Sequence, residues 1–234
     1  MLRLYLIRHG KSEYNQAKSA LHEEEMGPGG NTSLCTLCDR DTTLVDAPLC
    51  SIGQQQAKKL KAPGVDVVFV SPLTRALQTA EILFPSMVSQ FVVVPEAREY
   101  LSAICDIGQV AEVLRCRFPQ VVGLASLPDG VQWWADGDSP SHQSPEAFAM
   151  NPQMERMVTF QRRLRIVLEN YVLKAARTNA VTSIALVAHH DTIAYFVALN
   201  FGGSVEEYKL DNCEVLELLM DGEKCALLEA PKRS

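Results

Sequence analysis

Long apolar runs are missing from this 234-residue chain, and none approaches the ~20 residues that a membrane-spanning helix needs. The N-terminal apolar run is too short for a secretory signal peptide and ends in charged residues. Neither an internal repeat nor a linker between domains is recognisable. We therefore expect one domain over residues 1–234, with no membrane partner.

Regularly spaced cysteines are also missing. The seven cysteines form an odd, irregular set, which is typical of a reducing compartment rather than of a disulfide framework. Cys35 and Cys38, with Cys50 and His22 nearby, could be interpreted as zinc ligands, but no second Cys or His pair follows at regular spacing. We expect thiols in a surface insertion, no bound metal and a cytoplasmic location.

Positive charge is scarce, since the net charge is −6. This balance disfavours nucleic acid or an anionic membrane as the main partner. A cluster of arginine and histidine residues would therefore stand out against an acidic background. The apolar content of 47% is ordinary for a globular protein with a sizeable core.

What the sequence does contain is an alternation of short apolar runs and amphipathic stretches. This alternation predicts an α/β fold with a mostly parallel central sheet and helices on both faces. Strands are expected at residues 2–7, 66–70, 91–94, 183–188, 213–220 and 225–230. Helices are expected at residues 12–25, 51–60, 72–84, 107–117 and 152–177, and a last helix should end near residue 199.

Three details of this prediction concern helix starts, loops and the buried face of one helix. Ser51 and Ser71 are the expected N-caps of their helices. The stretches 27–49 and 121–151 lack usable periodicity and are expected to be loop insertions. On the helix at 152–177, the predicted buried stripe consists of Met154, Met157, Val158, Leu164, Val167, Leu168, Tyr171 and Val172.

Four of the predicted strands end in polar or titratable residues. These residues are Arg8-His9, Ser71 with Arg75 four positions later, Arg98-Glu99, and His189-His190. Ligands of open α/β sheets gather in the crevice beyond the carboxyl ends of the strands. We therefore expect these side chains to converge on one site.

Arg75 gives the sharpest indication of the ligand. It lies in the first turn of its predicted helix, where the helix dipole makes a cation unfavourable by about 0.3–1 kcal/mol. An anion at the helix N-terminus would reverse that sign, and the planar guanidinium is well suited to phosphate oxygens. Two arginines and two histidines in one cleft predict a dianionic ligand, of which phosphate is the commonest.

With phosphate in the cleft, His9 can act as a nucleophile that attacks phosphorus in line with the leaving oxygen. The arginines and His189 would stabilise the charge of the transferring group. A carboxylic acid must protonate the leaving alkoxide and later activate water. Glu99 is best placed for this role, and Asp191 is the alternative.

The motifs that carry this chemistry closely resemble those of the histidine phosphatase superfamily, also called phosphoglycerate-mutase-like. The similar segments are residues 6–15, with Arg8-His9-Gly10 at their centre, residues 70–80, residues 46–49 with 53–57, Arg98-Glu99, and residues 185–189. The resemblance implies a three-layer sandwich and a phosphohistidine mechanism without metal or organic cofactor. It also implies a phosphate pocket of His9, Arg8, Arg75 and His189, with Glu99 as proton donor and a hydrogen bond from Asn15.

Two departures from the family pattern leave alternatives open. The family usually has a small residue after its second histidine, whereas this chain has His190-Asp191, so this pair could replace His189 as the functional element. The tryptophan-bearing stretch and the acid-flanking motif of the mutases are absent, which favours a phosphatase. A mutase, or a catalytically weak phosphate-binding module, remains as the alternative. The substrate is expected to be a small phosphorylated compound or a phosphoprotein, and the oligomeric state stays open.

Overall fold

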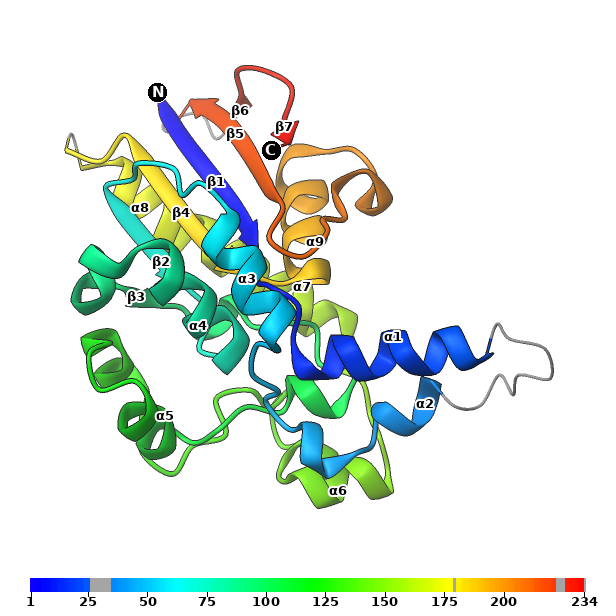
Figure 1. Ribbon diagram of the computed structural model, residues 1–234. Helices are drawn as coiled ribbons and strands as arrows, with labels where there is room; N and C mark the ends of the chain where they lie inside the picture. Colours follow the sequence, from blue (N-terminus) through cyan, green and yellow to red (C-terminus); the bar gives the residue numbers. More distant parts are fainter. Residues whose placement is uncertain (26–34, 179, 222–225, 234) are drawn as a thin grey trace.

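The chain folds around one seven-stranded sheet (Figure 1). The computed structural model describes residues 1–25, 35–178, 180–221 and 226–233. The strands run in the order β3-β2-β4-β1-β5-β6, and β7 also pairs with β5. Their bounds are β1 Leu2–Arg8, β2 Val67–Val70, β3 Val92–Val93, β4 Ser183–Ala188, β5 Val215–Asp221, β6 Ala226–Leu227 and β7 Lys232–Arg233. The first four strands in that order are mutually parallel, and β5 joins β1 antiparallel.

Helices cover both faces of the sheet (Figure 1). They are α1 Glu13–Glu25, α2 Cys35–Cys38, α3 Ser51–Lys59, α4 Thr74–Leu83, α5 Ala111–Arg117, α6 Pro145–Met150, α7 Met157–Ile166, α8 Leu173–Ala176 and α9 His190–Phe201. A π-helical stretch, Val167–Val172, joins α7 to α8. None of the helices within the described ranges is long and apolar enough to cross a membrane.

Strand β1 shows why the sheet is central. Leu2, Leu4 and Leu6 pack into a core shared with α7 and α9, whereas Ile7 packs into a second core with α4 and α5. A strand buried on both faces has a nearly continuous apolar sequence, as this one does. The prediction of an α/β fold with a mostly parallel sheet between two layers of helices is confirmed.

Both predicted N-caps are wrong. The N-cap of α3 is Cys50, without a side-chain hydrogen bond, and Ser51 is already helical. The N-cap of α4 is Leu73, and the helix begins at Thr74, so Arg75 is still in its first turn. The Ser71 hydroxyl accepts from the Leu73 amide at 3.3 Å and also contacts His189. A serine before a proline suits an N-cap locally, but here the helix begins too late for Ser71 to cap it.

The two predicted loop insertions are partly helical. The described part of 27–49 contains α2 and a short 3₁₀ turn, Thr42–Leu44, while residues 26–34 lie outside the described chain. The stretch 121–151 contains α6. Such helices are too short to show periodicity. A local apolar cluster stabilises them, with Trp134 and Phe148 buried against Leu101, Ile104 and Ile107.

The predicted helix at 152–177 begins later, at Met157. The preceding residues are held in non-helical conformation because the Glu155 amide donates to the Leu101 carbonyl and the Arg156 amide to the Asp136 carboxylate. Met154, Met157 and Val158 are consequently exposed, against the prediction. Leu164, Val167, Leu168 and Val172 are buried as predicted, and Tyr171 is half-buried. The helix predicted at 107–117 likewise begins only at Ala111, after a 3₁₀ turn at Ile104–Asp106.

Candidate active site

The turn after β1 sets the position of His9. Gly10 donates its amide to the Thr79 hydroxyl of α4 at 3.1 Å. A Cβ on Gly10 would lie 2.6 Å from the Gly53 carbonyl, and a Cβ on Gly53 would meet the Lys11 carbonyl at 2.0 Å. Glycine at both positions therefore lets this turn lie directly on the first turn of α3. The contact fixes the backbone on the carboxyl side of His9.

His9 is buried, with 3% of its surface exposed. Its Nδ1 lies 2.7 Å from the Gly10 carbonyl, which can only accept a hydrogen bond, so we place the proton on Nδ1. Its Nε2 accepts from Nε of Arg75 at 3.3 Å. Burial, with the charges of Arg75 and Arg8, holds the pKa of His9 well below its usual value. The imidazole is therefore neutral, and its Nε2 lone pair is the nucleophilic one.

Arg75 lies beside His9 and is only 3% exposed. Its guanidinium donates to the Cys105 carbonyl at 2.6 Å and to the Asp106 carboxylate at 2.9 Å. The sequence analysis took this cation at a helix start as a sign of a bound anion, but the chain's own Asp106 carboxylate already supplies an anion there. The ion pair with Asp106 leaves Nε of Arg75 directed at Nε2 of His9. A phosphoryl group on His9 would therefore lie next to the Arg75 guanidinium.

The second imidazole, His189, is fully buried and is the N-cap residue of α9. Its ring lies 5.1 Å from the His9 ring, centroid to centroid. Its Nε2 is 2.7 Å from the Ser71 hydroxyl. Burial, together with Arg75 and His9, holds the pKa of His189 well below its usual value. The prediction that β1, β2 and β4 deliver these groups to one edge agrees with the geometry.

Two buried side-chain atoms lack a hydrogen-bond partner within the described residues, and both belong to neighbours of His9, one in the chain and one ring against ring. They are Nδ1 of His189 and Nε of Arg8. Arg8 otherwise donates from Nη1 to the Leu210 carbonyl at 2.6 Å. A buried polar atom without a partner costs about 1–3 kcal/mol, and most such atoms in proteins are satisfied. Two of them beside one imidazole indicate that the site is built for a polar ligand.

Three carboxyl groups face the same site. Glu99 accepts hydrogen bonds from the amides of Asp191 at 3.3 Å and Thr192 at 3.0 Å, so it lies at the N-terminus of α9. Burial and the neighbouring Glu99 and Asp106 raise the pKa of Asp191 to about 6. Burial also raises the pKa of Asp106, against the opposing charge of Arg75. At neutral pH the site thus contains a carboxyl group that titrates in the range useful for proton transfer.

A buried ion-pair group holds the segment that carries Glu99. Arg163 of α7 donates to the carbonyls of Glu96, Arg98 and Glu99 at 2.6–2.8 Å. Glu155 accepts from Arg163 and also from Arg98. These contacts fix the backbone on both sides of the Arg98-Glu99 bond. Arg98 therefore has a structural position, directed away from the cavity.

The side chains enclose a cavity of about 320 Å³. Five of the six predicted site residues line it: Arg8, His9, Asn15, Arg75 and Glu99. His189 is not among the lining residues, although its ring lies beside that of His9, whereas His190 and Asp191 line the cavity themselves. Asn15 is oriented by Ser12, whose amide and hydroxyl both donate to its Oδ1.

Sequence reasoning missed Asp106 as the partner of Arg75 and missed Lys18 as a lining residue. A cation in the first turn of a helix does signal that some anion must be close. Nothing in the spacing indicates which of the distant carboxylates fills that place. Lys18 follows Asn15 by three positions, about one helical turn, so the two lie on the same face of α1, which is a usable signal once the site is placed there.

The possible zinc ligands do not come together as a site in the described chain. Cys38 is buried among Tyr14, Ala47 and Cys105, and Cys50 is buried at the start of α3. The side chain of Cys35 lies outside the described part. No group of three potential metal ligands is found among the residues that the structure describes.

Comparison with known proteins gives one family. The sequence profile described as "Histidine phosphatase superfamily (branch 1)" matches residues 30–231. Its match begins after β1, so Arg8 and His9 lie outside the matched range. A curated relative, "Putative phosphoserine phosphatase 2" of Hydrogenobacter thermophilus, is 26% identical over 97% of this chain and 94% of its own length.

Solved structures show the same fold. A phosphoglycerate mutase from Bacillus anthracis aligns with a TM-score of 0.54 and 18% identity, covering 94% of this chain and 88% of its own. A phosphoserine phosphatase from Entamoeba histolytica, solved with 3-phosphoglyceric acid, aligns with a TM-score of 0.53 and 16% identity, covering 100% and 95%. At these identities the likeness concerns the fold alone.

Proposed function

Because the chain belongs to the histidine phosphatase superfamily (branch 1), we propose that it hydrolyses phosphomonoesters through a phosphohistidine on His9. The observation that carries the proposal is the arrangement around that imidazole. His9 has a neutral ring with its Nε2 directed at Arg75, and the unpartnered Nδ1 and Nε atoms belong to its neighbours His189 and Arg8. With the Ser71 hydroxyl donating to Nε2 of His189, the ring proton of His189 lies on Nδ1, and a phosphoryl group has the oxygens that both donors lack.

In the first step, Nε2 of His9 attacks phosphorus, and the bond from phosphorus to the ester oxygen breaks. Arg75 gives up its contact with Nε2 and donates to a phosphoryl oxygen instead, with Arg8 and His189 donating to the others. The Gly10 carbonyl keeps the proton of Nδ1 in place, which stabilises the positive charge that develops on the ring. Asn15 is placed to donate from its amide nitrogen to the phosphoryl group or the substrate.

The leaving alkoxide needs a proton, and Glu99 is the proposed donor. Asp191 is the alternative, since its pKa of about 6 keeps it partly protonated near neutral pH. In the second step, the same carboxylate removes a proton from water, which attacks phosphorus as the P–N bond breaks. Free phosphate leaves, and His9 is again neutral. The three neighbouring carboxyl groups support this assignment, because like charges at short range favour a shared proton.

Replacement of His9 tests this function. His9→Ala should abolish release of phosphate from 4-nitrophenyl phosphate, because it removes the proposed nucleophile. Cys116, which is exposed on α5, gives a matched control, and Cys116→Ser should retain full activity. Hydrolysis by His9→Ala at the rate of the unchanged protein would contradict the proposal. Vanadate, which mimics five-coordinate phosphorus, should inhibit the unchanged protein.

A phosphoglycerate-type mutase would use the same intermediate but return the phosphoryl group to the substrate. The two activities separate when 3-phosphoglycerate is supplied and both free phosphate and 2-phosphoglycerate are measured over time. The phosphatase proposal expects free phosphate to form without the isomer. A phosphate-binding module would bind phosphate and release none from any ester. We also propose that the protein is cytoplasmic and that its substrate is either a small phosphorylated compound or a phosphoprotein.

A further inference from the structure

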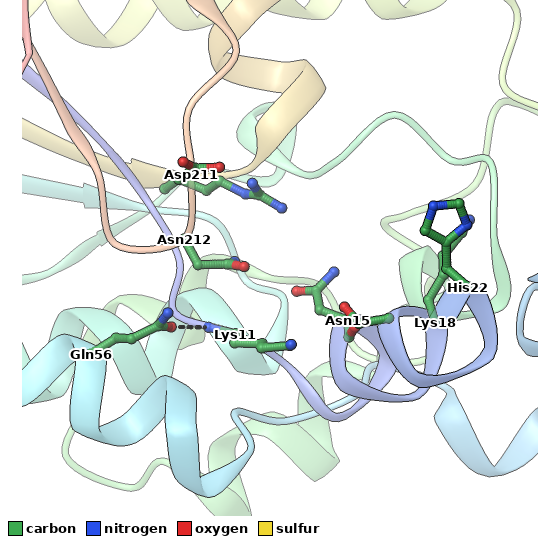
Figure 2. Close-up of a pocket in the computed structure, with 9 residues that line it drawn as sticks. Lys11, Asn15, Lys18, His22, Gln56, Asp211 and Asn212 are labelled. Carbon is green, nitrogen blue, oxygen red and sulfur yellow. Dashed lines mark hydrogen bonds between the residues drawn. The ribbon is translucent and has the colours of Figure 1, made fainter. Parts of the chain in front are cut away.

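A second cavity, shown in Figure 2, lies beside the cavity that contains His9, which we call the phosphate pocket. This side cavity, as we call it, has a volume of about 590 Å³ and shares Arg8, Asn15 and Lys18 with the wall of the phosphate pocket. Its size is typical of a small-molecule site. A substrate whose phosphate lies at His9 therefore has room to place its remaining atoms there.

The lining of the side cavity is cationic. Arg8, Lys11 and Lys18 contribute positive charge, and Asp211, at the exposed rim, is the carboxylate among the lining residues. Lys18 is already engaged, because its Nζ donates to the Tyr14 hydroxyl and to Asp39 at 3.0 and 3.1 Å. Lys11 differs, since its ammonium has no hydrogen-bond or ion-pair partner within the described ranges. The protein is acidic overall, so this concentration of cations is local.

One amide adds a directed donor, and a second amide fixes the cavity wall. The Oδ1 of Asn15 accepts from both the amide and the hydroxyl of Ser12, which turns the Asn15 Nδ2 towards the cavity. Asn212 donates from Nδ2 to the His9 carbonyl at 3.0 Å, so it links the cavity wall to the turn that carries the nucleophile. Figure 2 shows Lys11, Asn15 and Asn212 pointing into the same space.

We infer that the side cavity binds a second anionic group of the substrate, a carboxylate or a second phosphate, with Lys11 as its counter-ion. The inference rests on the proposed function and narrows its substrate class to small phosphomonoesters that carry another acidic group. A neutral group would leave the Lys11 ammonium and the Asn15 amide without partners. A cationic group would be repelled by Arg8, Lys11 and Lys18.

Matched substrates test the inference. Phosphoserine and phosphoethanolamine differ only in a carboxylate, and 1,3-propanediol bisphosphate differs from the monophosphate only in a second phosphate. We expect kcat/KM to be higher for the more acidic member of at least one pair, and the pair that responds identifies the acidic group. Equal kcat/KM within both pairs would overturn the inference.

Replacement of Lys11 ties the preference to this site. Lys11→Gln should lower the kcat/KM ratio of the responding pair about five- to tenfold, as expected for a partly exposed charge-assisted contact. Lys11→Arg should restore most of the ratio. Lys174→Gln, which removes an exposed charge on α8 away from the cavity, should leave the ratio unchanged. An unchanged ratio in Lys11→Gln would contradict the assignment to Lys11.

Binding measured without turnover separates this inference from the proposed function. In the His9→Ala background, calorimetry gives the dissociation constants of phosphoserine and phosphoethanolamine with and without Lys11→Gln. A preference for phosphoserine that Lys11→Gln removes supports the side cavity even if the unchanged protein hydrolyses no ester. Hydrolysis that depends on His9 but shows no preference for a second anionic group would contradict the inference and would still support the proposed function. Hydrolysis restricted to phosphoproteins would also overturn it.

Discussion

At the scale of single residues, the main question is which carboxyl group at the site acts as the general acid. Glu99 accepts two backbone amides at the start of α9, whereas Asp191 has a raised pKa of about 6. Both line the cavity that contains His9. A general acid contributes typically 10²–10⁴-fold, and only where the leaving group needs a proton. Comparing substrates whose leaving groups differ in their need for a proton therefore identifies which carboxyl group is the acid.

Glu99→Gln should lower kcat/KM for glycerol 2-phosphate by about 10²–10⁴-fold and affect 4-nitrophenyl phosphate far less, since nitrophenolate leaves without a proton. The ratio kcat/KM reports the first displacement, so a slow second step does not obscure the result. Asp191→Asn is the matched variant. A selective loss in Asp191→Asn instead would assign the acid to Asp191, and equal losses on both substrates in both variants would contradict an acid in either position.

The raised pKa of Asp191 also predicts a pH-dependent change in stability. From about pH 4 to pH 6 the folded chain keeps a proton that the unfolded chain has already lost, so the contribution of Asp191 to stability falls as the pH rises. Asp191→Asn should therefore raise the free energy of unfolding at pH 7.5 by about 1–2 kcal/mol after solvent screening is allowed for. The gain should shrink as the pH approaches 4.

Urea denaturation at pH 7.5 and pH 4 measures both values. Asp138→Asn removes an exposed carboxylate and serves as the control, with little change expected at either pH. An Asp191→Asn protein that is less stable than the unchanged protein at pH 7.5 would contradict this prediction. It would show that the folded protein stabilises the ionised form of Asp191.

Single residues were also where prediction from the sequence reached furthest. Arg8, His9 and Arg75 could be placed because each follows a recognisable strand, and parallel strands share one carboxyl edge. Asp106 could not, because its position depends on a 3₁₀ turn in an irregular segment. Lys11 and Asn212 escaped notice for a similar reason: they are 201 positions apart in sequence and meet only through the turn after β1.

At the scale of elements, helix α4 begins without a cap of its own. Its N-cap, Leu73, makes no side-chain hydrogen bond. Asp46 fills that place from a distant segment, accepting from the amide and the hydroxyl of Thr74 at 2.8 and 2.5 Å. Burial raises the pKa of Asp46 to about 6, and these two donors oppose the shift. The segment 46–49 therefore holds the start of the helix that carries Arg75.

Asp46→Ala should lower the free energy of unfolding by about 2–4 kcal/mol, because two buried donors lose their acceptor. Asp46→Asn should cost about half as much, since its amide oxygen still accepts from the Thr74 amide and asparagine tolerates the positive φ of 46° found here. The midpoint of urea denaturation measures both. A loss below about 0.5 kcal/mol in Asp46→Ala would show that Asp46 does not cap α4.

Element boundaries illustrate what local sequence can and cannot determine. The strand at 183–188 was predicted to the residue, because its apolar run is bounded by polar residues at both ends. The helix at 72–84 was placed correctly but with the wrong cap, since Asp46 lies far away in the sequence. Helix α6 was missed because its six residues are too few for a periodic signal and tertiary packing holds it.

At the scale of the whole molecule, the sheet assembles the candidate site from segments spread over the full chain. The ends of β1, β2 and β4, the loop after β3 and the start of α9 all meet at one edge. Helices α1, α2 and α6 lie beyond that edge rather than on the sheet (Figure 1). The central claim is therefore that this edge forms a single phosphoryl-transfer centre with His9 as nucleophile.

Trapping the intermediate tests that claim most directly. The protein is mixed rapidly with a turning-over phosphomonoester, quenched in alkali and digested, and the peptides are analysed by mass spectrometry. We predict one phosphoryl group on the peptide that contains His9, stable in alkali and lost in acid, and none in His9→Ala. A phosphoryl group on another residue, or turnover during which no phosphopeptide forms at any time, would contradict the account.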